Sequence, residues 1–176
     1  MIYVSPVAND LSKILFAVAK VESAVELQKT DICYYAAVDF QHLVIANLTN
    51  QKYASSYAPY SEIYKDWKLK QKVEMKYWKL YGDLVQNIKA FKVPIGGGKS
   101  GWIAGVVPGV KASKSSQMWG TAKRRILIST YARLNEFGRK DQPPKPLFVP
   151  TKNEYSEDGF PKRGQKSLDK IKWSWS

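Results

Sequence analysis

The sequence contains only one cysteine, Cys33, and one histidine, His42. A single cysteine cannot build an internal disulfide framework, and its place in an apolar stretch suits a reducing compartment. One cysteine and one histidine also cannot assemble the usual zinc ligand sets. The two residues are nine positions apart, about 900° around a helix, so they would lie on opposite faces. We therefore expect no metal site and no catalytic Cys/His pair, and we interpret His42 as a core or interface histidine.

Long apolar runs are missing as well. No stretch approaches the roughly 20 uncharged apolar residues of a membrane span. The N-terminus, MIYVSPVANDLSK, has no basic region, long apolar run or small-residue cleavage site of the kind found in signal peptides. We expect a protein that is made in the cytosol, stays soluble and has no membrane partner.

Acidic residues are few beside the basic ones, and the net charge is +13. Residues 1–58 contain four lysines and five acids, whereas the rest of the chain contains 24 basic and 10 acidic residues. A basic bias confined to one region indicates a polyanion or an acidic protein surface as a neighbour. The alternative is a lysine-rich surface that only keeps the protein soluble, and charge alone does not separate these possibilities.

What the sequence does contain is enough apolar material for one folded domain. The chain has 176 residues, 44% of them hydrophobic and 13% aromatic, which is well above the content of a disordered chain. We predict a single domain over residues 1–150 and a C-terminal extension over residues 151–176.

The N-terminal third shows helical periodicity. Asp10 is a suitable N-cap for an amphipathic helix, with a break predicted near Gln28–Thr30. Asp31 can cap a second helix that runs to about Asn50. Because this second helix is apolar on nearly all sides, we expect it to be buried on more than one side. Either a neighbouring subunit supplies part of the cover, or it is a central core helix.

The middle of the chain predicts short helices and a hairpin. Helices are expected at residues 61–69, from Trp78 to Phe91, and from Lys123 to Phe137, the last with Gly138 as its left-handed cap. The expected strands and other segments are Ala90–Ile95, Trp102–Val110, a polar loop over residues 111–122 and a weak helix over residues 167–173. The predicted fold class is α+β, with N-terminal helices packed on a small antiparallel sheet and an extended proline-rich C-terminal arm.

The segment Gly96–Ser100, GGGKS, invites comparison with a phosphate-binding loop. That motif requires a glycine five residues before the Gly-Lys-Ser, and Val93 occupies this position. The segments on both sides also have the character of strands, whereas a nucleotide loop must open a helix. We interpret the segment as a hairpin turn, and since carboxylates are sparse, we expect no cofactor and no enzymatic activity.

Basic residues alternate with aromatic residues in two segments, 64–72 and 76–79. Such a mixture suits nucleic acid, because lysine pairs with phosphates and rings stack on bases. On a helix, however, lysine stems can simply flank packed aromatic rings. The triplet Lys123, Arg124 and Arg125 is a more compact candidate for contact with DNA or with an acidic partner, although a charged helix start is the commoner explanation.

Two segments carry the most information. The second, Tyr131–Thr151, combines a helix that stops at Gly138, a charged turn, a proline spacer and a Leu-Phe pair. We name residues 138–150 the arm. The first segment contains Pro59-Tyr60-Ser61 and then a Trp-x-Leu-x-Gly-Asp-Leu motif. The residues that carry these patterns are Pro59, Tyr60, Ser61, Tyr64, Trp67, Lys68, Tyr77, Trp78, Leu80, Gly82, Asp83, Leu84, Ile88, Tyr131 to Gly138, Pro143, Lys145 to Phe148, Pro150 and Thr151.

In order and spacing, these two segments resemble the tail-completion (tail-component) family of long-tailed bacteriophages. The resemblance covers roughly Tyr57 to Thr151. It departs from the family at Lys145, where arginine usually precedes Pro-Leu-Phe. Lysine keeps the charge but lacks the planar fork that binds a carboxylate through two hydrogen bonds. The chain after Thr151 carries no further family motif.

The resemblance implies a structural protein of the virion, located at the neck or tail top and assembled in the host cytoplasm. It implies a homo-oligomeric, hexameric ring that contacts other neck, connector and tail-terminator proteins, with non-specific DNA contact in the lumen. A heterologous ring needs a projecting element on each subunit, and the arm is our candidate, with Phe148 as its anchor. The alternative is that Leu147 and Phe148 fold back onto their own subunit. The predicted interface residues are Phe137, Gly138, Pro143, Lys145, Pro146, Leu147 and Phe148.

The other function class that the sequence leaves open is a small basic protein that binds DNA without sequence preference. It would use the lysine- and aromatic-rich segments together with Lys123, Arg124 and Arg125.

Overall fold

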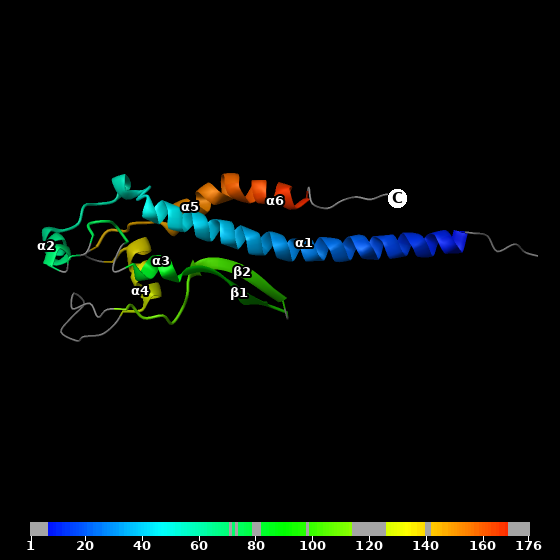
Figure 1. Cartoon of the computed structure of the whole chain (residues 1–176), viewed down its shortest axis with the longest axis horizontal. Helices are drawn as coiled ribbons and strands as arrows, with labels where there is room; N and C mark the ends of the chain where they lie inside the picture. The colour runs from blue at the N-terminus through cyan, green and yellow to red at the C-terminus, as the bar shows by residue number, and fades with distance from the viewer. Residues whose placement is uncertain are drawn as a thin grey trace, which may run out of the picture.

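A single 43-residue helix, α1 (Val7–Thr49), is the longest element of the molecule (Figure 1). The structure, a computed structural model, describes residues 7–70, 72, 74–78, 82–97, 99–113, 126–139 and 142–168. The predicted break near Gln28–Thr30 is wrong. No glycine or proline interrupts α1, and the polar side chains bind within the helix. Lys29 Nζ lies 2.6 Å from Glu26 Oε1, and the Thr30 hydroxyl donates to the Glu26 carbonyl. Nothing local therefore ends the helix.

The predicted hairpin is confirmed. Strands β1 (Ile88–Gly96) and β2 (Lys99–Val106) form a two-stranded antiparallel sheet in which Phe91 pairs with Ile103. The sheet packs along α1, where the Tyr34 and Trp102 rings lie 4.7 Å apart edge to face. The second strand ends at Val106, four residues earlier than predicted.

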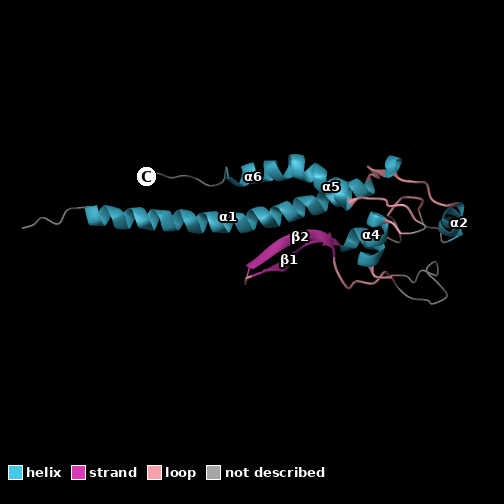
Figure 2. Ribbon diagram, turned by 180° about the vertical axis from the view of Figure 1, so that it is seen from behind, coloured by secondary structure: helices cyan, strands magenta, loops and turns pink. Residues whose placement is uncertain are grey.

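A helical segment at the C-terminal end lies on the other side of α1 (Figures 1 and 2). It consists of α5 (Phe148–Glu154), the π-helical turn η3 (Tyr155–Gly159) and α6 (Phe160–Leu168). Arg163 of α6 binds Asp39 of α1 with two hydrogen bonds, from Nε at 2.6 Å and from Nη2 at 2.7 Å. Of the weak helix expected over residues 167–173, residues 167 and 168 are the end of α6, and the other residues lie outside the described part of the chain.

The structure has no boundary at residue 150, where we expected the domain to end. The position falls inside α5, and the next residue, Thr151, is fully buried. Its hydroxyl accepts a hydrogen bond from Asn47 Nδ2 of α1, which also donates to Glu154. Residues 151–168 therefore belong to the same folded unit as the rest of the chain.

The remaining short elements gather at the C-terminal end of α1. They are η1 (Ala54–Ser56), α2 (Glu62–Lys70), α3 (Asp83–Asn87) and α4 (Ile128–Phe137). The helices predicted over residues 61–69 and 123–137 correspond to α2 and α4, although residues 123–125 lie outside the described part of the chain. The helix predicted from Trp78 to Phe91 is wrong in length. Trp78 has φ 61° and Gly82 has φ 80°, so the helix begins only at Asp83 and gives way to β1 at Ile88.

The hydrophobic core lies among these short elements and the end of α1. Its buried members are Val44, Leu48, Tyr57, Trp78, Leu84, Ile88, Ile128, Tyr131, Ala132 and Leu147. The α+β fold class is confirmed, with one long N-terminal helix in place of two. None of the helices in the described part of the chain combines the length and apolar character needed to cross a membrane.

The two parts of α1 differ sharply in burial. Every side chain that the structure describes from Leu15 to Asp31 is exposed, and Leu15, Phe16 and Val18 are exposed by 62%, 63% and 49%. Figure 1 shows this end extending past both the hairpin and α6. We call residues 7–31 the projecting segment and residues 32–49 the packed segment. The hairpin and α5–α6 cover the packed segment on two sides, but Tyr34 and Tyr35 within it are exposed by 38% and 42%. The cover by a neighbouring subunit therefore stays a prediction. His42, which we interpreted as a core or interface histidine, is exposed, so it is not a core residue, and its place at an interface stays a prediction.

Candidate interaction site

The arm does not project from the molecule. Arg139 and Gln142 exchange two backbone hydrogen bonds, and the Lys145 amide donates to the Asn135 carbonyl of α4 at 2.6 Å. The chain therefore doubles back along the helix that it has just left. Lys145 is 2% exposed and Leu147 is 1% exposed. The prediction of a projecting arm is wrong, and the alternative that it folds back onto its own subunit is what the structure shows.

Gly138 makes this reversal possible. It ends α4 with φ 72° and ψ −173°, so φ is positive as predicted, but ψ is extended rather than left-handed helical. A Cβ atom here would lie 2.7 Å from the Gln142 carbonyl oxygen and 2.8 Å from Pro144 N. Only glycine fits such a close return of the backbone.

Phe148 is not at the tip of an extended arm, because it is the first residue of α5. Its ring packs edge to face on Trp78, 5.9 Å away between centroids. Pro150, which we took to extend the arm, instead lies in the first turn of the helix. Proline is tolerated there because its missing N–H would have no partner within the helix.

The start of α5 is capped by Glu136, a buried carboxylate of α4. Its Oε2 accepts hydrogen bonds from the amides of Leu147 and Phe148, at 2.8 and 3.0 Å, and its Oε1 accepts one from Val149 at 2.8 Å. The next residue, Pro150, has no N–H group. The three hydrogen bonds and Pro150 together therefore account for all four amide positions that a helix start leaves without partners within the helix. The sequence does not reveal this role of Glu136, because its carboxylate lies 11 to 13 residues away from the amides in the chain.

A second buried charge belongs to Lys68, which is 1% exposed. Its Nζ donates to the carbonyls of Glu74 and Lys76, at 2.8 and 2.7 Å, and lies 4.7 Å from the centre of the Tyr60 ring. Burial lowers the pKa of Lys68 to about 8. Trp78 is also buried. Neither residue can reach a nucleic acid, so the packing alternative describes Lys68 and Trp78, while Lys70, Lys72 and Lys76 of the same segments are exposed.

A cavity of about 270 Å³ lies where α2, α4 and the arm meet. Its lining includes the rings of three tyrosines and three polar or cationic side chains, namely Tyr60, Tyr64, Tyr131, Arg139, Gln142 and Lys145. The Lys145 ammonium lies 5.5 Å from the centre of the Tyr60 ring and 5.9 Å from that of Tyr77. Burial lowers the pKa of Lys145. We call this cavity the tyrosine–lysine pocket.

The other predicted site residues divide into two groups. Phe137 is 70% exposed and Pro143 is exposed, so both remain accessible to another molecule, while Pro146 is half-buried. Lys123, Arg124 and Arg125 lie outside the described residues. In the part of the chain that the structure describes, no three His, Cys, Asp or Glu side chains gather as metal ligands would.

The two segments singled out by sequence meet in space. The Tyr57 hydroxyl donates to the Pro146 carbonyl at 2.6 Å, Trp78 packs on Phe148, and Lys145 lies over Tyr60 and Tyr77. They thus form one structural unit at one end of the molecule. Comparison with models of known protein families, with curated proteins and with solved structures finds no match for this chain.

Proposed function

We propose that this chain is a structural protein of the neck or tail top of a long-tailed bacteriophage. In this role it forms a ring, completes the tail and helps to join it to the head-side connector, without catalysing a reaction. One observation carries the proposal. The two segments that resemble the tail-completion family, separated by nearly 50 residues between Leu84 and Tyr131, come together as one packed unit.

The way this unit is built supports a structural role. Its buried polar groups mostly hold backbone: Glu136 binds three amides and Lys68 binds two carbonyls. Tyr57 binds a third carbonyl, that of Pro146. Satisfied buried networks of this kind rigidify a fold. A rigid end suits a subunit that must present the same surface at every position of a ring.

The element that reaches toward a neighbouring subunit is, in this proposal, the projecting segment of α1 rather than the arm. Leu15, Phe16 and Val18 are about half exposed or more. Monomeric proteins rarely leave a contiguous apolar surface in water, and such surfaces mark interaction sites. Phe137 and Pro143, at the opposite end of the molecule, remain predicted interface residues.

The net charge of +13 fits the proposed location. A ring around the path of the genome gains from positive charge near its lumen, where lysines attract phosphates without reading sequence. An acidic partner ring would use the same charge. In both cases we expect the contact to weaken as salt concentration rises.

Mass photometry of the purified chain and of partly assembled particles tests the proposal. We expect ring-sized species, and we expect the substitution Phe16→Glu in the projecting segment to reduce them by at least tenfold. We call the packed segment, together with the elements that pack on it or gather at its end, the packed end of the molecule. Phe160 of α6 belongs to the packed end and is 49% exposed, so Phe160→Glu is the matched control and should assemble normally. A chain that stays monomeric and is absent from virions would overturn the proposal.

In the second function class, a small basic DNA-binding protein, Lys68 and Trp78 make no contact because they are buried, whereas Lys70, Lys72 and Lys76 of the same segments are exposed. Titration with duplex DNA at two salt concentrations still separates the two proposals. Submicromolar binding at physiological salt would favour the DNA-binding alternative.

A further inference from the structure

Lys145 is a buried cation to which no described residue supplies a counter-charge. Its side chain is almost wholly enclosed, at 2% exposure. Among the described residues, no hydrogen bond or ion pair of its Nζ is found, and the centres of the Tyr60 and Tyr77 rings lie 5.5 and 5.9 Å from it. A buried ammonium is normally paired, because removing it from water without a partner is costly.

The neighbouring buried charges are satisfied, which makes Lys145 the exception. Lys68 donates to two carbonyls, and Glu136 accepts from three amides. Arg139, on the pocket lining, is already engaged in another interaction. Of the four described residues Lys68, Glu136, Arg139 and Lys145, only Lys145 has a charge without a partner among the described residues.

That residue lines the tyrosine–lysine pocket, whose character suits a small anion. No acidic side chain of the described residues lines the pocket, while Arg139 and Lys145 both do. Its volume of about 270 Å³ is below the usual range for a drug-sized ligand but is enough for one side chain. The Tyr60, Tyr64 and Tyr131 rings provide apolar walls for an aliphatic stem.

We propose that the tyrosine–lysine pocket binds the side-chain carboxylate of a glutamate or aspartate on a partner polypeptide. One unpaired ammonium matches one negative charge, as a carboxylate carries, better than a phosphate dianion. A duplex phosphate is flanked by sugars and cannot enter a cavity that leaves Lys145 only 2% exposed. The inference rests on the proposed function for the source of the partner, which is another subunit of the neck. The binding chemistry stands on the pocket alone.

NMR titration of the full chain, with labelled tyrosine rings as reporters, tests the pocket directly. The probe is N-acetyl-glutamate N-methylamide, with the glutamine analogue as its neutral control. We expect saturable shifts of Tyr60 and Tyr64 with a dissociation constant of about 1–10 mM, and no saturable shift with the control. Lys145→Met should weaken binding at least tenfold, whereas Lys152→Met, at an exposed lysine of α5, should not change it.

Gln142→Glu provides a second variant that keeps Lys145 in place. A carboxylate supplied by the pocket lining itself should raise the melting temperature and abolish binding of the probe. This variant also decides the outcome if Lys145→Met fails to fold.

The inference is overturned if the glutamate probe gives no saturable shift, or if Lys145→Met and Gln142→Glu both bind it like the parent. Tighter binding of N-acetylglycine would assign the pocket to a chain terminus instead, and tighter binding of inorganic phosphate would assign it to a phosphate. Both results contradict the proposal. Failure of ring assembly would overturn the proposed function without changing any of these titrations.

Discussion

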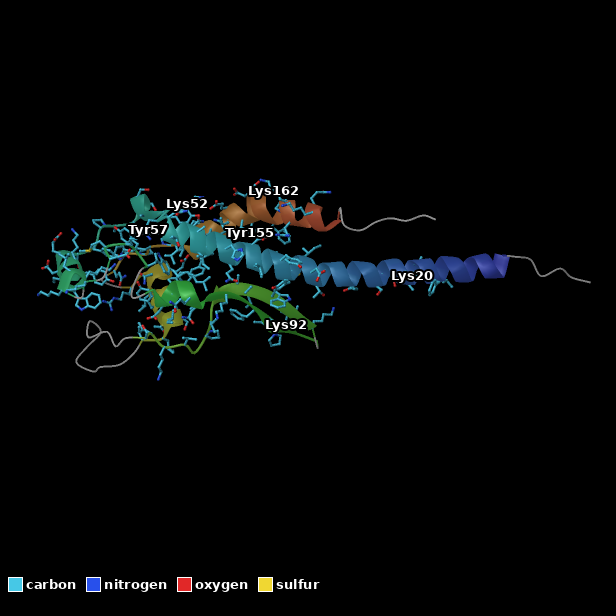
Figure 3. All side chains as sticks on the ribbon, viewed as in Figure 1. Lys20, Lys52, Tyr57, Lys92, Tyr155 and Lys162 are labelled. Atoms are coloured by element: carbon cyan, nitrogen blue, oxygen red, sulfur yellow. The ribbon has the colours of Figure 1, made fainter. Side chains whose placement is uncertain are left out.

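The two segments of α1 belong to one uninterrupted helix, yet they meet different surroundings. The packed segment lies between the hairpin and α5–α6, and Val44 is fully buried within it. The projecting segment extends beyond both, with Phe16 exposed by 63%. Figure 3 shows Lys20 on the projecting segment, far from the Lys52 and Tyr57 side chains at the packed end.

This difference separates residues that stabilise the fold from residues that are free for assembly. The chain folds around its packed end, so a change there alters the free energy of unfolding. The projecting segment adds little to that core, and in the proposed function its exposed apolar residues contact a partner. Each prediction below pairs a residue of the packed end with a chemically matched residue of the projecting segment.

The largest expected difference is between two glutamates. Glu136→Ala removes the acceptor of three buried amides, so the free energy of unfolding should fall by about 3 kcal/mol or more. Glu22 is exposed on the projecting segment, and Glu22→Ala should change stability by less than about 0.5 kcal/mol. Urea denaturation of both variants measures this, and equal losses would remove the distinction between the segments.

Two valines provide the next comparison. Val44→Ala leaves a cavity in the core and should lower the free energy of unfolding by about 2 kcal/mol. Val18 is 49% exposed, so Val18→Ala should leave monomer stability within about 0.5 kcal/mol of the parent. Thermal unfolding followed by circular dichroism compares them. A large loss for Val18→Ala would mean that the projecting segment contributes to the core of the monomer.

The third comparison concerns pH and gives a gradual effect. Burial lowers the pKa of Lys68 to about 8 in the folded chain, against about 10.4 in the unfolded chain. Between these values the unfolded chain holds more protons, so the free energy of unfolding should rise as pH increases from about 8. Above about pH 10 the trend should reverse, because the pKa of buried Tyr57 is raised to about 12 and the unfolded tyrosine loses its proton first.

Lys68→Met should reduce this rise, while Lys20→Met should keep it, since Lys20 is exposed on the projecting segment. Chemical denaturation at pH 7, 8, 9 and 10 provides the measurement. If the free energy of unfolding rises equally with pH in both variants, Lys68 does not cause the rise.

The smallest expected difference lies between two ion pairs. Arg163 binds Asp39 through two hydrogen bonds and joins α6 to α1, so Arg163→Met should lower stability by about 0.5–1 kcal/mol. Lys29 pairs with Glu26 on the projecting segment, where both side chains are more than half exposed. Lys29→Met should therefore have an effect of at most about 0.3 kcal/mol. Hydrogen exchange over α6 should increase only in the Arg163 variant.

The parts of the fold that could be predicted from sequence depend on local signals. Glycines between runs of β-branched residues indicated the hairpin, and Gly138 after a periodic segment indicated the end of α4. These features depend on residues next to one another in the chain, so a window of a few residues contains enough information.

The parts that could not be predicted depend on contacts between distant residues. Pro150 suggested an extended arm, but Glu136 supplies the cap that allows a helix to start at Phe148. The burial of Lys68 and Lys145 follows from the packing of α2 and the arm around the tyrosines. The break predicted near Gln28–Thr30 gave too much weight to polar residues, which are acceptable in a helix without glycine or proline.

Hydrogen–deuterium exchange of α1, measured in the free chain and in the assembled virion neck, tests the central claim most directly. In the free chain, amides of the packed segment should be protected and those of the projecting segment should exchange rapidly. In the assembled neck, the projecting segment should become protected by at least tenfold while the packed segment changes little. Unchanged exchange of the projecting segment on assembly, or full protection of it in the free monomer, would contradict the account.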